Sequence, residues 1–168
     1  MKKRTPARTL AILSMLVAVA MLLSYIEHLI PPLVAIPGVK LGLANVASVF
    51  ALYILGRKYA IAVSLVRVLL SSMLFGNPAA FIYALSGAVL ALLGMCLLKS
   101  VPLFSEVGVS VVGAVLHNVG QIAAAAVVMR TGEIILVYLP PLIITGTVAG
   151  VVIGIASGLL VRRLKNKI

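Results

Sequence analysis

The chain has 168 residues, of which 63% are hydrophobic and 10% charged, whereas an average soluble domain has about 25% charged residues. Its mean hydropathy of +1.27 excludes an ordinary soluble domain and predicts an all-α integral membrane protein that crosses the cell membrane several times. The net charge of +11 would suggest nucleic acid as a partner of a soluble protein. Here the basic residues lie at the ends of apolar runs, so we expect a lipid bilayer around the chain and no nucleic-acid partner.

The first apolar run follows a basic start and covers residues 9–26. The basic start and Ala18-Val19-Ala20 imitate a secretory signal peptide, which is one interpretation of this segment. The run stays apolar through Leu23 instead of turning polar after the small residues, so we expect a retained transmembrane helix. Segment 27–40 then has three prolines and Gly38 among apolar residues, which predicts a loop folded against the membrane face that could serve as a lid.

Five further apolar runs complete the chain, and we expect a single membrane domain over residues 1–168 with six transmembrane helices. The second and third runs are short for spanning helices, which usually need about 17 to 25 residues. Near the end, apolar residues resume at Ile134 but are interrupted by Pro140-Pro141, so we expect the last helix to start at Leu142. The expected helices are 9–26, 41–55, 59–75, 78–98, 107–129 and 142–161.

The basic residues indicate the orientation of these helices. With six crossings, one side of the membrane holds most of them, and the other side holds Lys40 and Arg130. The richer side should be cytoplasmic, which places both termini in the cytoplasm. Its basic residues are Lys2, Lys3, Arg4, Arg8, Arg57, Lys58, Lys99, Arg162, Arg163, Lys165 and Lys167.

Glycines recur every four residues in the last helix, at 146, 150, 154 and 158. Such a strip lets a neighbouring backbone approach closely. We interpret it as internal helix packing, with an external docking surface as the alternative. Ala7 and Ala11 have the same spacing near the start of the first helix.

The fifth run, 107–129, places His117, Asn118 and Gln121 inside an apolar helix. His117 would lie roughly 15 Å from the start of the run, near the middle of a hydrocarbon core about 30 Å thick, where a polar group needs a partner or a function. One interpretation is a cluster of hydrogen bonds between helices, which could include Asn45 of the second run. The other is a polar pocket for a small molecule. No cysteine or carboxylate stands beside the histidine at a ligand spacing, so we expect no metal site and no cofactor.

Arg67 is the one basic residue inside an apolar run, with Ser64 and Ser71 on the same helix face. A charge at that depth costs several kcal/mol unless it is paired or hydrated, so the side chain should face the protein interior. Glu27, near the outer end of the first helix, is a candidate partner. Alternatively, Arg67 supplies positive charge to an anionic or carbonyl-bearing ligand, and the two roles are compatible.

Three segments carry a resemblance to a known family: LGLAN at Leu41 to Asn45, SLVRVLL around Arg67, and GAVLHNVGQ at Gly113 to Gln121, after a first helix that ends with Glu27 and Pro31-Pro32. The chain resembles the membrane family labelled heptaprenyl diphosphate synthase component I, or Gx transporter, which is grouped with the S components of energy-coupling factor (ECF) transporters.

The resemblance implies a six-helix bundle that captures a small molecule near its outer side. It also implies a loop that closes over the molecule, and a coupling membrane subunit with cytoplasmic ATPases that drives release. In such proteins an Ala-x-x-x-Ala motif on the first helix docks onto the coupling subunit, and Ala7 and Ala11 match it.

The synthase label conflicts with the composition. Prenyl diphosphate synthases bind magnesium through clustered aspartates, because hard cations require several oxygen ligands. This chain has no aspartate, its three glutamates (Glu27, Glu106 and Glu133) are far apart, and it has no Gly-rich phosphate loop. We therefore expect no enzyme activity. The alternative function is a noncatalytic membrane subunit or anchor of an isoprenoid synthase.

The expected substrate site is lined by Arg67, His117, Asn118 and Gln121, with Asn45 and Glu27 as further members. Arg67 favours an anionic group, and the absence of Trp disfavours large flat ligands. Vitamins that bear a carboxylate and precursors of isoprenoids or quinones remain open.

Overall fold

The computed structural model describes residues 5–30 and 42–164. Within these residues the fold is all-α, as expected, with six helices. They are α1 (Pro6–Leu29), α2 (Asn45–Ile54), α3 (Arg57–Phe75), α4 (Pro78–Leu98), α5 (Glu106–Met129) and α6 (Glu133–Leu164). The expected lid lies mostly outside the described residues. Its first residues, including Glu27, belong to the last turn of α1.

Local sequence signals explain where three of the helices begin. The side chains of Thr5 and Asn77 accept hydrogen bonds from backbone N–H groups three residues later, and each is followed by proline. Ser105 caps α5 in the same way. A capping oxygen satisfies an N–H that has no partner within the helix, and proline suits the first helical position because it lacks that N–H.

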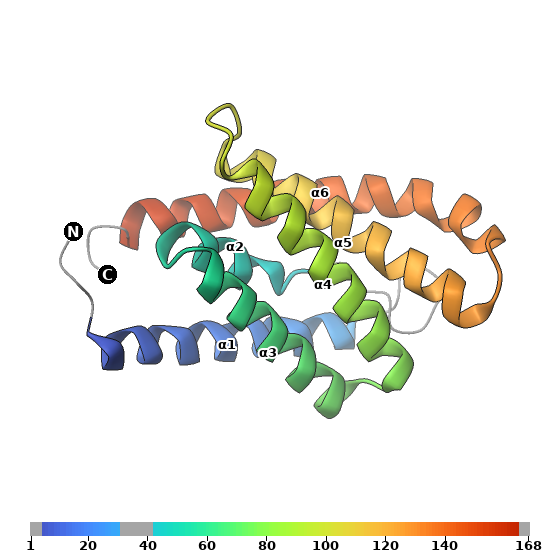
Figure 1. The fold of residues 1–168 in the computed structure, drawn as a ribbon, viewed down its shortest axis with the longest axis horizontal. Helices are drawn as coiled ribbons and strands as arrows, with labels where there is room; N and C mark the ends of the chain where they lie inside the picture. The colour runs from blue at the N-terminus through green and yellow to red at the C-terminus, as the bar shows by residue number, and fades with distance from the viewer. Residues whose placement is uncertain (1–4, 31–41, 165–168) are drawn as a thin grey trace.

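Helix α5 lies between α4 and α6, whereas α1 lies at the edge of the bundle against α2 and α3 (Figure 1). Only Ala20, Ser24 and Glu27 of α1 are buried. The rest of its surface is largely apolar and exposed, including Leu10, Met15 and Leu22. In a bilayer this surface faces lipid or a membrane partner.

Helix α2 is short and enclosed. It has 10 residues, eight of them buried, and packs against α1, α3, α5 and α6. Ten residues rise about 15 Å, half of the hydrocarbon thickness. The other five helices are long and apolar enough to cross a membrane. The expected second helix, 41–55, is thus a half-length helix whose N-terminus, Asn45, lies inside the bundle.

Helix α6 begins at Glu133 and continues through Pro140 and Pro141, so the expected start at Leu142 is wrong. The two prolines remove backbone donors, but residues before them still pack against α5. This apolar packing holds the first turns of α6 in place, which the local sequence did not predict. The cluster contains Tyr83, Ile122, Ala125 and Leu142, with Ile134, Ile135, Tyr138 and Leu139 against it.

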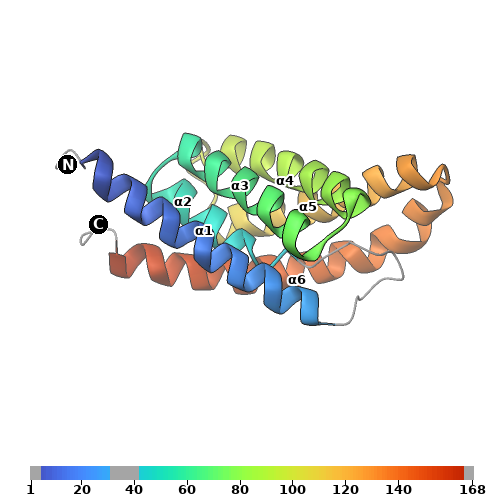
Figure 2. The same cartoon turned by 90° about the horizontal axis from the view of Figure 1, so that it is seen from below.

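The start of α1, the α2–α3 turn, the α4–α5 loop and the end of α6 lie at one end of the bundle (Figures 1 and 2). Two basic side chains connect α2 and α3 to the α4–α5 loop: Arg57 donates to the hydroxyl of Ser100, and Lys99 donates to the carbonyl of Leu52. Arg130 lies at the opposite end, in the turn between α5 and α6. The basic segments therefore share one side, as the charge pattern predicted.

The glycine strip of α6 packs against α5. A β-carbon at Gly150 would lie 2.5 Å from the Cα of Val111, and one at Gly154 would lie 2.6 Å from the Cα of Val107. These distances leave no room for a side chain, so the two backbones are in direct contact. The interpretation as internal packing is confirmed. Gly158 differs, because the nearest atom to its β-carbon would be the Cβ of Glu106, at 3.9 Å.

We predict that Gly150→Ala lowers the free energy of unfolding in mild detergent by about 1–3 kcal/mol, because the new methyl group forces α5 and α6 apart. Gly158→Ala is the matched control: its methyl group has space, so the free energy of unfolding should stay the same or rise by up to about 1 kcal/mol, because alanine favours a helix. Equal effects of the two substitutions would show that the α5–α6 contact does not limit stability.

We also predict opposite labelling of two cysteines in a Cys96→Ala background. Gly132→Cys, in the α5–α6 turn, should react with a membrane-impermeant maleimide in intact cells. Leu103→Cys, in the α4–α5 loop, should react only after the membrane is permeabilised. The reverse result would overturn the orientation.

Candidate functional site

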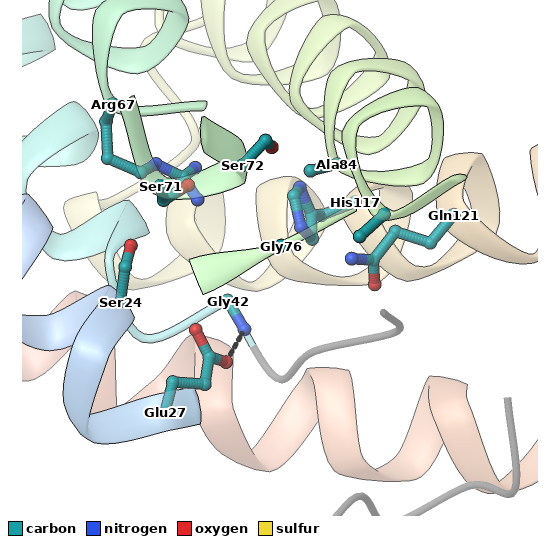
Figure 3. A pocket seen from close by; sticks show the side chains of 11 residues that line it. Ser24, Glu27, Gly42, Arg67, Ser71, Ser72, Gly76, Ala84, His117 and Gln121 are labelled. Atoms are coloured by element: carbon teal, nitrogen blue, oxygen red, sulfur yellow. Dashed lines mark hydrogen bonds between the residues drawn. The ribbon is translucent and has the colours of Figure 1, made fainter. Parts of the chain in front are cut away.

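A small polar cavity lies where α1, α3, α4 and α5 meet (Figure 3). Its volume is about 20 Å³, room for roughly one water molecule. The lining combines charged and polar side chains with small residues that let the helices approach. The lining residues are Ser24, Glu27, Gly42, Arg67, Ser71, Ser72, Gly76, Ala80, Ala84, His117 and Gln121.

Arg67 reaches the cavity from the middle of α3 and is 5% exposed. Ser64 and Ser71 lie one turn away on either side, on the same buried helix face. One guanidinium nitrogen, Nη2, donates to Oδ1 of Asn45 at 3.1 Å. Asn45, at the N-terminus of α2, therefore holds the guanidinium in position, although Asn45 itself does not line the cavity.

Glu27 lines the same cavity from α1. Its Oε1 accepts a hydrogen bond from the backbone N–H of Gly42 (Figure 3) and another from the backbone N–H of Leu43 at 3.3 Å. Gly42 has a φ of +83°, a conformation that glycine adopts without strain. Glu27 thereby holds the chain that enters α2, and its negative charge also acts on Arg67. The expected partners share one cavity, but each also has hydrogen bonds of its own.

His117 and Gln121 reach the cavity from α5, one turn apart, and each is almost completely buried. Gly87 of α4 lies opposite, and a β-carbon there would lie 2.9 Å from both Nδ1 of His117 and Cγ of Gln121. The missing side chain at Gly87 thus makes room for both side chains between α4 and α5.

Asn118 lies on another side of α5. Its Nδ2 donates to the backbone carbonyl of Leu142 at 2.7 Å, and it is not among the lining residues. This contact joins α5 to α6 next to Gly146. Of the six expected site residues, four line the cavity, Asn45 supports one of them, and Asn118 connects two helices.

Two lining serines, Ser24 and Ser72, were missed in the sequence. Ser24 lies three residues before Glu27, on the same face of α1, and this spacing was a usable signal. Ser72 had no comparable signal, because serine is common in membrane helices and carries no charge.

Several buried polar atoms of the lining have no hydrogen-bond partner among the described residues: Oγ of Ser24, Nε of Arg67 and Oε1 of Gln121. An unpartnered buried polar atom costs about 1–3 kcal/mol. The atoms include a donor, an acceptor and a hydroxyl that can be either. They therefore suit a polar group of a ligand. Among the described residues, no group of three His, Cys, Asp or Glu side chains could hold a metal ion.

An open groove adjoins the cavity on the outside of α3 and α4. Its volume is about 410 Å³, and its lining is mainly apolar. Ser72 and Gly76 belong to both linings, so the groove and the cavity meet at these two residues. The remaining groove residues are Leu69, Met73, Asn77, Pro78 and Phe81.

Comparison with known proteins identifies a solved structure and a protein family that are similar to this chain. No curated protein matches the chain. A solved structure described as the S component of a bacterial ECF transporter matches with a TM-score of 0.73 and 23% sequence identity, covering 97% of this chain and 98% of that chain. At this identity the likeness establishes a shared fold, the one that the sequence resemblance implied. Residues 16–160 match the model of the family described as heptaprenyl diphosphate synthase component I, and the chain therefore belongs to that family.

Proposed function

We propose that this protein is the substrate-binding S component of an ECF-type uptake transporter, and that the cavity around Arg67 binds its small-molecule substrate. One observation carries the proposal: unpartnered polar atoms from α1, α3 and α5 line one cavity inside a membrane protein with the fold of an S component. If the polar cluster served only to join helices, its members should bond to one another across the helix contacts, as Nδ2 of Asn118 does to the carbonyl of Leu142, although Oδ1 of Asn118 has no partner among the described residues.

Each residue has a distinct role in this proposal. Arg67 binds an anionic or carbonyl oxygen of the substrate, Gln121, His117 and Ser24 give directional hydrogen bonds, and Asn45 positions Arg67. Small-molecule sites usually measure about 300–1,000 Å³. A cavity of about 20 Å³ therefore holds only one polar group of the substrate, and Glu27 restrains the adjoining backbone at Gly42.

We propose that the protein lies in the plasma membrane. Its proposed partners are a membrane-embedded coupling subunit and ATPases on the cytoplasmic side. Ala7 and Ala11 are exposed on α1, and Ser14 and Ala18 continue this row of small exposed residues. Since α1 contributes little to the packing of the bundle, a partner helix could approach its backbone closely along this row.

The family description favours a second candidate, a noncatalytic membrane anchor for an isoprenoid synthase. The basic end of the bundle would then receive the soluble enzyme. This candidate leaves the polar cavity without a function.

We predict that a small molecule copurifies with the wild-type protein in mild detergent at a stoichiometric level detectable by mass spectrometry. Arg67→Gln should reduce its occupancy at least about tenfold, because the neutral amide cannot replace the charge-assisted hydrogen bonds. Arg130→Gln is the control, since Arg130 is an exposed arginine at the α5–α6 turn. A monodisperse elution profile and the variant Arg67→Lys test whether loss of ligand reflects loss of fold. An empty wild-type protein that binds a soluble prenyltransferase would favour the anchor.

We also predict that Ala7→Leu and Ala11→Leu reduce copurification with the coupling subunit without changing ligand occupancy. Leu10→Phe adds similar bulk to another exposed face of the same turn and should have little effect. Unchanged complex formation in both alanine variants would contradict docking at this row.

A further inference from the structure

We propose that the substrate is a monocarboxylic acid with an apolar chain. Its carboxylate would bind at Arg67, and its chain would pass along Ser72 and Gly76, which line both spaces, into the groove on α3 and α4. This inference rests on the proposed function, because it assigns a chemical class to the ligand of the same cavity.

The charged side chains of the lining favour a ligand with one negative charge over a ligand with several. Arg67 is the only permanent cation among the described residues of the lining, and its planar guanidinium suits a carboxylate. Glu27 contributes a carboxylate to the same lining, but its Oε1 accepts hydrogen bonds from the backbone N–H groups of Gly42 and Leu43. By contrast, Nε of Arg67 has no partner among the described residues and can donate to a ligand. A diphosphate would add several negative charges in a low-dielectric site with one arginine, which leaves them uncompensated.

The size of the cavity selects a compact group. A volume of about 20 Å³ has room for roughly one water-sized group, so a compact polar head group fits and a ring system does not. The remaining lining is small: Gly42, Gly76, Ala80 and Ala84. Apart from the imidazole of His117, no aromatic side chain is present among these residues to stack on a flat ligand. The rest of the substrate must therefore lie outside the cavity.

The adjoining groove can hold the apolar chain of the substrate. Figure 3 draws Ser72 and Gly76 between Arg67 and His117, and the same two residues border the groove. Beyond them the groove is apolar, with Leu69, Met73 and Phe81. Met73 is 75% exposed, so none of the six described helices covers this surface. A polar cavity that continues into an apolar groove matches a molecule with an acidic head and an apolar chain.

Paired photoreactive probes test this class in lipid nanodiscs. One probe is an eight-carbon carboxylic acid with a diazirine on its chain, and the other is its primary amide. We expect the acid to label the groove at Met73 or Phe81 at least about tenfold more than the amide does, because only the acid pairs with Arg67. Labelling of the exposed Leu159 on α6 normalises for unequal partitioning into the bilayer.

Variants of Arg67 and Ser72 test the binding of the carboxylate and of the apolar tail of the probe separately. Arg67→Gln should reduce acid labelling to the amide level, whereas Arg67→Lys should retain part of it and shows that the fold persists. Ser72→Leu should block the path into the groove and abolish groove labelling, whereas Val66→Leu, on the exposed side of the same helix and outside both linings, should leave it unchanged. Equal labelling by both probes, or acid labelling that is independent of Arg67 and Ser72, would overturn the inference.

The copurified compound distinguishes failure of this inference from failure of the proposed function. If the compound requires Arg67 but has no carboxyl group or no apolar chain, the S-component function stands and this substrate class is wrong. If the wild-type protein binds neither a native compound nor the acid probe, both fail.

Discussion

The need to satisfy a permanent charge inside a membrane determines how this protein is built. Arg67 lies in the middle of α3, where an unpaired charge would cost several kcal/mol. Asn45 of α2 takes one of its hydrogen bonds, and Glu27 of α1 contributes an opposite charge. Yet Nε of Arg67 remains unpartnered among the described residues. The fold thus secures the guanidinium while leaving hydrogen-bonding capacity at the cavity, which is costly for a structural cluster and useful for a binding site.

Close backbone contacts make this arrangement possible. Glycines on α6 let α5 approach closely, and Gly87 and Gly120 do the same between α4 and α5. Helix α5 is consequently fixed on two sides, which places His117 and Gln121 toward the cavity and Asn118 toward α6. The short α2 begins within the bundle, and this brings its first residue, Asn45, to the level of Arg67. Packing energy at the glycines therefore supports the unfavourable polar centre.

The cost of burying polar groups made much of the site predictable. Arg67, His117, Gln121 and Glu27 stand out in apolar runs, and all four line one cavity. The separate role of Asn118 was not predictable, because one step along a helix turns a side chain by about 100°, and its partner depends on where α6 lies. The start of α6 was also mispredicted, because packing against α5 overrides the effect of Pro140 and Pro141. Six helices and the common side of the basic segments followed from hydropathy and charge.

The proposed function requires the cavity to be a binding site and not a cluster that joins helices. The most direct test compares the free energies of unfolding of two ligand-free α5 variants in mild detergent. Gln121 has an unpartnered oxygen at the cavity, so Gln121→Met should leave stability unchanged or raise it. Asn118→Leu removes the hydrogen bond to the carbonyl of Leu142 and should lower stability by about 1–2 kcal/mol. If Gln121→Met lowers stability as much as Asn118→Leu, the polar cluster joins helices and the account is wrong.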